Sequence, residues 1–230
     1  MMTMGSPIAP DVLERTGLFR PVTERHDRIA VVGTGHSLKG VDIEFGPEVY
    51  IIAVNGAHRI LKRFDAWFTL DLSRTNLEFM KKKTKKVQHF LAVPSDYGRM
   101  DARLARMRRK PDSYVHYLLR VSGEGHGRFK TRSRLPDDPR VIHTGNSGWG
   151  AFQLACHMQP EKVGLFGFDG FGGYAYGGKP IDLKPMRDLF SSAKDQVQER
   201  GIRVANGSVN SVIECFPRET PQDVVRWLEE

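Results

Sequence analysis

A glycine-rich turn near the start of the chain is the first segment whose residue types could do chemistry. Gly33 to Ser37 reads G-T-G-H-S and directly follows the apolar run Arg28 to Val32. Its glycines would let backbone N–H groups approach a phosphate, and the Ser37 hydroxyl could donate to the same group. The spacing completes neither G-x-G-x-x-G, because Gly40 is one place too far, nor a P-loop. We interpret the turn as one wall of a nucleotide site, although a plain strand-to-helix turn explains the same letters.

A second turn of small polar residues, Asn146 to Gly148, precedes a run with apolar residues at helical spacing, Trp149 to Met158. The start of a helix has free N–H groups and the positive end of the helix dipole, so it can seat a phosphate. Ser147 as an ordinary N-cap accounts for the same letters. Two such turns in one sheet would suit the two ends of a nucleotide ligand.

Asp169 follows another apolar run and could hold a ribose, bind a cation or act as a base; a cap on the next loop is the structural alternative. That loop, Phe171 to Lys179, is rich in glycine and carries Tyr174 and Tyr176, which suits a mobile lid over a phosphate. His36 and His143 are the histidines best placed to act as bases near neutral pH, although a lone histidine more often has a structural role.

These residues need a scaffold, and the apolar runs predict a largely parallel sheet flanked by helices, an α/β fold. We expect strands at Arg28–Val32, Val49–Val54, Asp65–Leu70, Lys86–Val93, Val141–His143, Lys162–Phe168 and Ile202–Ala205. Helices are expected at Asp11–Leu18, Asp101–Arg109, Trp149–Met158, Pro185–Arg200 and Pro221–Leu228, with a brief helical turn at Ser37-Leu38 and Gly201 as a C-cap. No internal repeat divides the 230 residues, so we expect one domain with an N-terminal preamble, 1–27, and a basic insertion, 99–138.

In open α/β sheets, ligands bind in the crevice at the carboxyl ends of the strands. Glycine and polar residues recur just past the predicted strands, which indicates a shared site. The candidates at these positions are Gly33, Thr34, Gly35, Ser37, Asn55, Asp71, His143, Asn146, Ser147, Gly148, Asp169 and Asn206.

The net charge is +8, and much of it lies in two segments. Lys81 to Lys86 reads KKKTKK, and Arg103 to Arg134 has ten basic residues against two acidic ones, interleaved with tyrosines. A solvated helix face with a loop explains this composition, and so does a groove for a polyanion such as nucleic acid.

Cys156 and Cys215 lie in apolar runs, so we expect free thiols and a cytoplasmic protein. The N-terminus has no signal-peptide pattern, no apolar run is long enough to span a bilayer, and no protein-only metal motif is present.

Six segments, in order, resemble the small bacterial lipooligosaccharide sialyltransferases and the phage and bacterial proteins described as hydroxymethylpterin-pyrophosphokinase-like. The first loop is similar to their G-N-G-P-S-L loop, and the lid segment to their Y-A-F. The matching segments are Val31–Leu38, Ile52–Asn55, Thr144–Gly148, Val163–Asp169, Tyr174–Tyr176 and Asn206–Ser211. The resemblance implies a single Rossmann-like domain that binds a nucleotide-sugar donor without an obligatory metal. It also implies that Gly33, Gly35, Ser37, Asn55, Ser147 and Gly148 hold the nucleotide and that Tyr174 contacts its phosphate.

The sequence departs from that family at two places. The family's base is a histidine after the lid, whereas no histidine occurs from Tyr176 to Glu230. The first lid tyrosine of the family is here Phe171. Asp169 and Asp182 are the candidate replacements for the base, since a suitably placed carboxylate can deprotonate a hydroxyl.

Three hypotheses follow. The leading one is a nucleotide-sugar-dependent glycosyltransferase acting on a polyanionic acceptor, of which hydroxymethylated phage-type DNA is one example. The second is an ATP-dependent pyrophosphokinase acting on a small heterocycle. The third is a non-catalytic protein that binds a nucleotide or nucleic acid, having kept the fold and lost the base.

Overall fold

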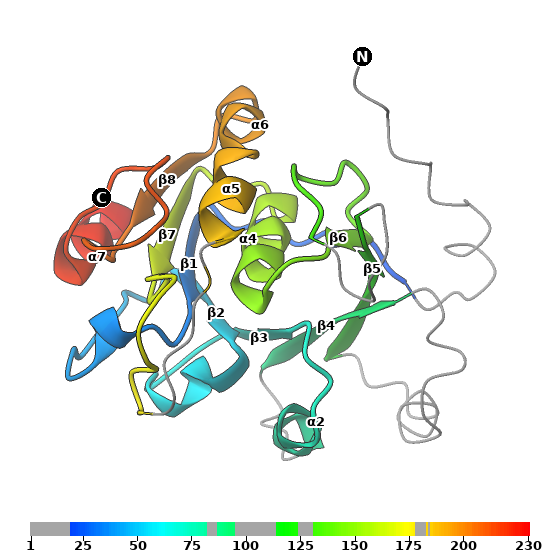
Figure 1. Cartoon of the computed structure of the whole chain (residues 1–230), viewed down its shortest axis with the longest axis horizontal. Helices are drawn as coiled ribbons and strands as arrows, with labels where there is room; N and C mark the ends of the chain where they lie inside the picture. Colours follow the sequence, from blue (N-terminus) through cyan, green and yellow to red (C-terminus); the bar gives the residue numbers. More distant parts are fainter. Residues whose placement is uncertain (1–18, 82–86, 95–113, 124–130, 178–182, 184) are drawn as a thin grey trace.

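The computed structural model describes residues 19–81, 87–94, 114–123, 131–177, 183 and 185–230. Within these residues, eight parallel strands form one sheet in the order β6-β5-β4-β3-β2-β1-β7-β8 (Figure 1). The strands are β1 (Arg28–Val32), β2 (Tyr50–Val54), β3 (Ala66–Thr69), β4 (Gln88–Pro94), β5 (Val115–Val121), β6 (Val141–His143), β7 (Lys162–Phe166) and β8 (Arg203–Asn206). The predicted α/β class with a parallel sheet is confirmed.

The central strands are buried on both faces because helices or turns cover each side of the sheet. In β1, Ile29 to Val32 have no exposed surface, as expected for a parallel strand made of a continuous apolar run. Alternate side chains enter two separate apolar clusters, with Val31 in one and Val32 in the other. Because all the strands are parallel, their carboxyl ends lie at the same edge of the sheet, where the sequence predicts the site.

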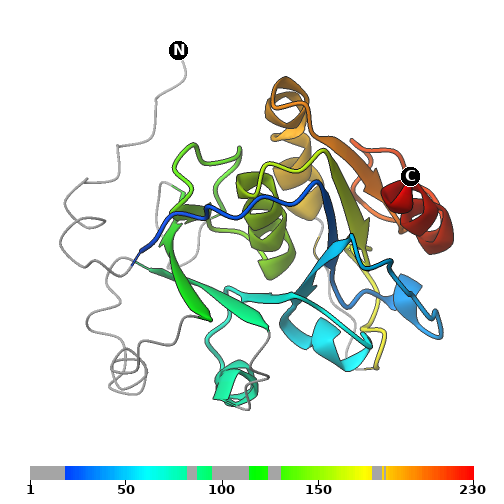
Figure 2. The same cartoon turned by 180° about the vertical axis from the view of Figure 1, so that it is seen from behind.

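Helices α4 (Ser147–His157), α5 (Pro185–Ser191) and α6 (Lys194–Glu199) contribute to the apolar cluster on one face. The other face is covered by α7 (Pro221–Glu229) and by the 3-10 turns η1 (His36–Leu38) and η2 (Asn55–Arg59). Figure 2 shows α7, in red, beside the orange strand β8. Of the described residues, none form a helix that combines the length and apolarity needed to cross a membrane.

The predicted helix Pro185–Arg200 is wrong as a single element, because it is divided into α5 and α6 around Ser192. The Ser192 hydroxyl donates to Leu189 O at 2.6 Å and accepts from Arg134 N at 2.8 Å. A serine hydroxyl that bonds to the carbonyl three residues earlier competes with the hydrogen bonds of the helix, which favours the break at Ser192. The apolar face predicted for this segment is confirmed, since Met186, Leu189, Phe190, Ala193 and Val197 are all buried.

Strand β5 lies in the basic segment that the sequence predicted to be a helix and a loop, and that prediction is wrong for Val115 to Val121. The strand pairs with β4 and β6, so this part of the basic segment is built into the sheet. Helix α2 (Arg74–Lys81) was also not predicted. The predicted helices Asp11–Leu18 and Asp101–Arg109 lie outside the described residues.

At one edge of the sheet, the outward backbone groups of β6 are hydrogen-bonded by residues outside the sheet. Gln153, which has no exposed surface, accepts from His143 N at 2.7 Å and donates to His143 O at 3.1 Å. Val141 N donates to Asp138 O at 3.0 Å, and His157 Nε2 donates to Val141 O at 2.9 Å. The buried helix α4 and the carbonyl of Asp138 thus supply the hydrogen bonds that a ninth strand would otherwise make.

We expect Gln153→Leu to lower the free energy of unfolding by about 2–4 kcal/mol, because it leaves two buried backbone groups of His143 without partners. Gln198→Leu on the exposed face of α6 is the matched control and should change it little. Urea denaturation of both variants measures the difference, and equal stabilities would contradict the role assigned to Gln153.

Candidate functional site

The strand order reverses at β1. Strands β2 to β6 follow one another on one side of β1, whereas β7 and β8 lie on its other side. Ligands of open α/β sheets bind where the loops from two neighbouring strands diverge at such a switch point. Here those loops are Gly33 to Ser37, after β1, and the segment from Gly167 onward, after β7.

The turn after β1 packs tightly against the loop after β7. Gly33 N donates to Phe166 O at 2.7 Å, and Gly35 N donates to Gly167 O at 3.0 Å. A Cβ on Gly35 would lie 2.6 Å from both Gly167 O and Asp169 Oδ2, which is closer than atoms can pack. The glycines are therefore required by this close approach, and their N–H groups already have protein partners. A phosphate near this turn needs other groups to hold it.

Asp169 joins the two loops. Its side chain is only 6% exposed, and Oδ2 accepts from Ser37 N at 2.7 Å. Among the described residues, Oδ1 is buried and has no hydrogen-bond partner. A buried carboxylate oxygen that accepts nothing is costly, and such atoms are rare in folded proteins. Among the candidate residues, Asp169 and Asn206 each have a buried side-chain oxygen without a partner in the described residues, and of the two only Asp169 is a carboxylate.

Two serines after β8 support this arrangement; both lie in the resembling segment Asn206–Ser211, but neither was among the candidate site residues. Ser208 Oγ lies 3.1 Å from Ser37 Oγ and accepts from Phe168 N at 3.3 Å. Ser211 Oγ donates to Phe168 O at 2.5 Å. Both serines are almost fully buried, so they fix the segment that carries Asp169. We call Gly33 to Ser37, Asp169 and Ser208 the first wall of the site.

Asn55, which follows β2, bonds to a second group of polar residues. It adopts a left-handed backbone with φ of 49°, a conformation for which asparagine is enriched. Its carbonyl oxygen accepts from Trp67 Nε1 at 2.8 Å, and its side-chain Oδ1 accepts from Thr69 Oγ1 at 2.7 Å. The side chain is thereby directed along the carboxyl ends of the strands toward β3.

The second group lies at the ends of β3, β5 and β6. Asn76 Nδ2 donates to Asp71 O at 2.8 Å, and Asp71 N donates to Thr69 Oγ1 at 2.9 Å. Arg120, from the unpredicted strand β5, donates through Nη1 to Leu70 O at 3.2 Å and through Nε to Thr144 Oγ1 at 3.3 Å. Burial lowers the pKa of Arg120, and the nearby negative charge of Asp71 opposes that shift. We call Thr69, Asp71, Asn76, Arg120 and Thr144 the second wall.

Helix α4 begins between the two walls. Its N-cap is Asn146, whose Oδ1 accepts from Trp149 N at 2.9 Å, so the assignment of Ser147 as N-cap is wrong. Ser147 Oγ instead accepts from Leu70 N at 3.4 Å, at the end of β3. A Cβ on Gly148 would lie 2.7 Å from the Phe168 ring, in the loop after β7. The first N–H groups of the helix therefore lie close to both walls, and such groups have no carbonyl partner within the helix.

The glycine- and tyrosine-rich loop lies against the first wall (yellow in Figure 1). Tyr174 forms an antiparallel bridge with Gly35, and Ala175 N donates to Thr34 O at 2.8 Å. The rings of Tyr174 and Tyr176 stack with centroids 5.3 Å apart, and the Arg59 guanidinium lies 5.2 Å from the Tyr176 ring centroid. The loop is thus placed where a lid over the ends of β1 and β2 would be.

His143 is poorly suited to be the base. It is 7% exposed, and Nδ1 donates to Arg134 O at 2.7 Å. Burial, together with the positive charge of Arg132, lowers its pKa to about 4, although the hydrogen bond to Arg134 O opposes the shift. His36 begins η1 on the first wall. Asp182, the other carboxylate considered as a base, lies outside the described residues.

No group of three or more histidine, cysteine, aspartate or glutamate side chains arranged to hold a metal ion occurs in the part of the chain that the structure describes. Cys156 is buried and Cys215 partly buried, and both are free thiols, as predicted.

Comparison with known proteins finds similarity at the level of structure. No protein-family model matches the chain, and no curated protein matches its sequence. A solved structure with a similar fold is that of the sialyltransferase CstII from Campylobacter jejuni, in complex with the substrate analogue CMP-3FNeuAc. The two chains share 12% identity, the match covers 85% of this chain and 86% of that chain, and the TM-score is 0.48.

We expect Gly35→Ala to destabilise the protein by about 1–3 kcal/mol. The added methyl group would clash with the Gly167 carbonyl and with the Asp169 carboxylate, which is fixed by its hydrogen bond to Ser37 N. Gly56→Ala is the control. Its Cβ would also come within 2.8 Å of another atom, but that atom is the hydroxyl of the half-exposed Tyr176, which can move. Thermal denaturation should separate the two variants, and equal losses would refute the rigid packing of the first wall.

His143 should make the fold sensitive to acid. Its folded pKa of about 4 lies below the unfolded value of about 6.5, so the unfolded chain binds the proton more tightly and stability falls as pH drops below 6.5. Between pH 7 and pH 5 this residue alone should cost about 2 kcal/mol. In His143→Gln, the loss of unfolding free energy over that interval should be smaller by this amount; parallel curves for variant and wild type would contradict the assignment.

Proposed function

We propose that the protein is a nucleotide-sugar-dependent glycosyltransferase whose donor lies across the carboxyl ends of β1, β2, β3 and β7. The observation that carries the proposal is the buried, unpartnered Oδ1 of Asp169 at the switch point of the sheet. A hydroxyl of the donor ribose or sugar would give this oxygen the hydrogen bond that it does not receive from the described residues. A carboxylate in this position can also accept the proton of an attacking hydroxyl.

In the proposal, the remaining predicted residues bind other parts of the donor. The first wall forms one side of the proposed site, Asn55 and the start of α4 form its floor, and the tyrosine loop closes over it. The residues assigned to donor binding are Gly33, Thr34, Gly35, Ser37, Asn55, Asp71, Asn146, Ser147, Gly148, Tyr174 and Tyr176. Asp169 and Asp182 are the candidates for the base.

The proposed reaction balances without a redox partner. The acceptor hydroxyl oxygen bonds to the anomeric carbon of the sugar, the bond from that carbon to the nucleotide phosphate oxygen breaks, and the base takes the hydroxyl proton. Because the leaving nucleotide carries negative charge, the site must hold an anion as it departs.

The acceptor that we propose is polyanionic. The net charge of +8 and the clustered lysines and arginines favour an anionic macromolecule, and DNA bearing hydroxymethylated bases would supply both the phosphates and the acceptor hydroxyl.

The full-length chain, incubated with a panel of nucleotide sugars and with DNA that does or does not carry hydroxymethylated bases, should give sugar transfer or slow donor hydrolysis. Mass spectrometry of the acceptor and chromatography of the released nucleotide provide the readouts. Absence of both transfer and hydrolysis would rule out the enzyme. Release of AMP from ATP with a pterin-like heterocycle would indicate pyrophosphoryl transfer instead, and tight nucleotide binding without turnover would indicate a binding protein.

Asp169→Asn is the decisive variant in that experiment. The asparagine oxygen can still accept from Ser37 N, so the fold should be retained, whereas the charge and proton affinity of Oδ1 are lost. We expect kcat/KM to fall by about 100-fold or more, within the range for removal of a catalytic acid–base group. The control is Asp188→Asn in the first turn of α5, which is exposed and should leave the rate unchanged. Equal rates for wild type and Asp169→Asn would remove Asp169 from the chemistry.

A further inference from the structure

The N–H groups that the glycine-rich turn was expected to offer to a phosphate are bonded within the protein. Gly33, Gly35 and Ser37 all donate to β7 or to the loop that follows it. Asp169 adds a carboxylate on the same wall, which repels an anion. Since the proposed donor is anionic, its negative group has to be bound away from the first wall.

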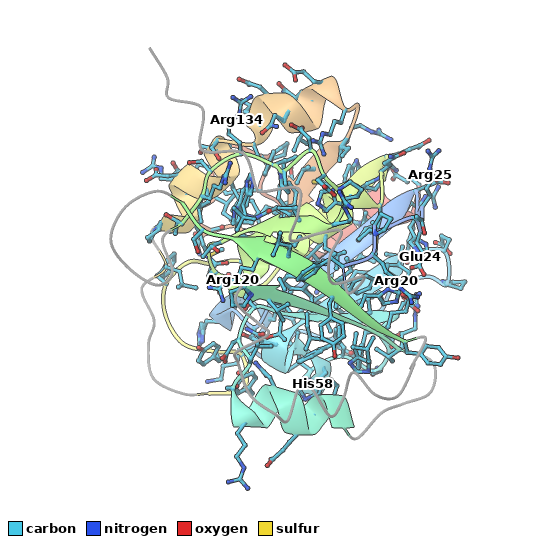
Figure 3. All side chains as sticks on the ribbon, turned by 90° about the vertical axis from the view of Figure 1, so that its right-hand side faces the viewer. Arg20, Glu24, Arg25, His58, Arg120 and Arg134 are labelled. Carbon is cyan, nitrogen blue, oxygen red and sulfur yellow. The ribbon has the colours of Figure 1, made fainter. Side chains whose placement is uncertain are left out.

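The second wall has the suitable group. The Arg120 guanidinium is only partly buried, and it is held at the ends of three strands by Leu70 O and Thr144 Oγ1. Figure 3 shows Arg120 on the opposite side of the view from Arg20, Glu24 and Arg25, which precede β1 at the amino ends of the strands. Arg120 thus faces the same edge of the sheet as the first wall.

The start of α4 adds to the positive potential at this place. Ser147 Oγ accepts from the N–H of Leu70, the same residue whose carbonyl binds Arg120. The guanidinium and the positive end of an 11-residue helix therefore meet at one residue. A guanidinium oriented by hydrogen bonds to Leu70 O and Thr144 Oγ1 has the planar fork that pairs with a carboxylate or phosphate.

The spacing of the sheet shows what kind of ligand reaches both walls. Three strand intervals separate β7, which leads to Asp169, from β3, which leads to Leu70 and Asp71. At roughly 4.8 Å per interval this is about 14 Å. A ligand that satisfies Asp169 with a hydroxyl and Arg120 with an anion must be extended, as a nucleotide joined to a sugar is.

We propose that Arg120 is the specificity-determining cation of a second subsite, which binds an oxyanion on the half of the donor that does not contact Asp169. The oxyanion is either the phosphate of the nucleotide or a carboxylate on the transferred sugar. This inference rests on the proposed function for the identity of the ligand, but the anion subsite itself can be tested without turnover.

The test measures thermal unfolding of the full chain with inorganic phosphate or glucuronate, at constant ionic strength maintained with sodium chloride. At about ten times the Kd, wild type should gain about 3–6 °C in Tm. Arg120→Met should lose this gain whatever its starting Tm, and Arg120→Lys should keep only part of it, because lysine lacks the planar fork. If neither anion raises the Tm of wild type, or Arg120→Met gains as much, the inference is overturned.

Two further variants exclude a merely structural role. Arg63→Met is the matched control, because Arg63 also donates to main-chain carbonyls, Gly46 O and Val49 O, but lies before the amino end of β3. It should keep the full anion response. Asp71→Asn should strengthen anion binding by about threefold, since it removes a negative charge near the guanidinium. An unchanged or weaker response in Asp71→Asn would contradict the electrostatic role of Arg120.

The source of the oxyanion is identified with paired ligands. If the phosphate binds Arg120, Arg120→Met should weaken the binding of UMP at least tenfold and leave the binding of uridine unchanged. If a sugar carboxylate binds Arg120, the same variant should weaken the binding of UDP-glucuronate and leave the binding of UDP-glucose unchanged. Anion binding by Arg120 without any nucleotide binding would disprove the proposed function alone, whereas nucleotide binding that is indifferent to Arg120 would disprove this inference alone.

Discussion

The contact between the turn after β1 and the loop after β7 is the constraint on which the site depends. The two loops leave neighbouring strands and would be expected to diverge, yet Gly33 and Gly35 approach the β7 loop so closely that neither position has room for a Cβ. Asp169 then joins them through the N–H of Ser37. A carboxylate is held in a buried position with one oxygen committed and the other without a partner in the described residues.

From that contact, the polar residues extend along one edge of the sheet. Asn55 links the end of β2 to Thr69 at the end of β3, and Arg120 links β3 to β5 and Thr144. Each link is a hydrogen bond between segments far apart in sequence. The parallel arrangement of the strands is what makes this possible, because it places every carboxyl end at the same edge.

The sequence was most informative where the chain is buried on both sides. Continuous apolar runs mark β1, β2, β3 and β7, and the polar residue that follows each run marks the edge where the site lies. It was least informative at β5, where His116, Tyr117 and Arg120 interrupt the apolar pattern. An arginine within a basic segment is typical of a charged, solvent-exposed surface, so the pattern gave no indication of a strand. Only strand pairing shows that Arg120 lies in the sheet between β4 and β6. The position of the glycine turn was predicted correctly. Its glycines, however, are explained by packing against β7 and the loop that follows it. That contact joins residues more than 130 positions apart, so it cannot be predicted from the local sequence.

The outer edge of β6 has a consequence for how this molecule meets other copies of itself. An edge strand usually offers unpaired N–H and C=O groups, which makes it a template for strands of other chains. In β6, the outward groups of Val141 and His143 are bonded by Asp138, His157 and Gln153. A strand from a second molecule would have to displace buried side chains of α4 before it could pair. The backbone groups at the β6 edge are therefore already bonded, and addition of strands from other molecules at this edge is disfavoured.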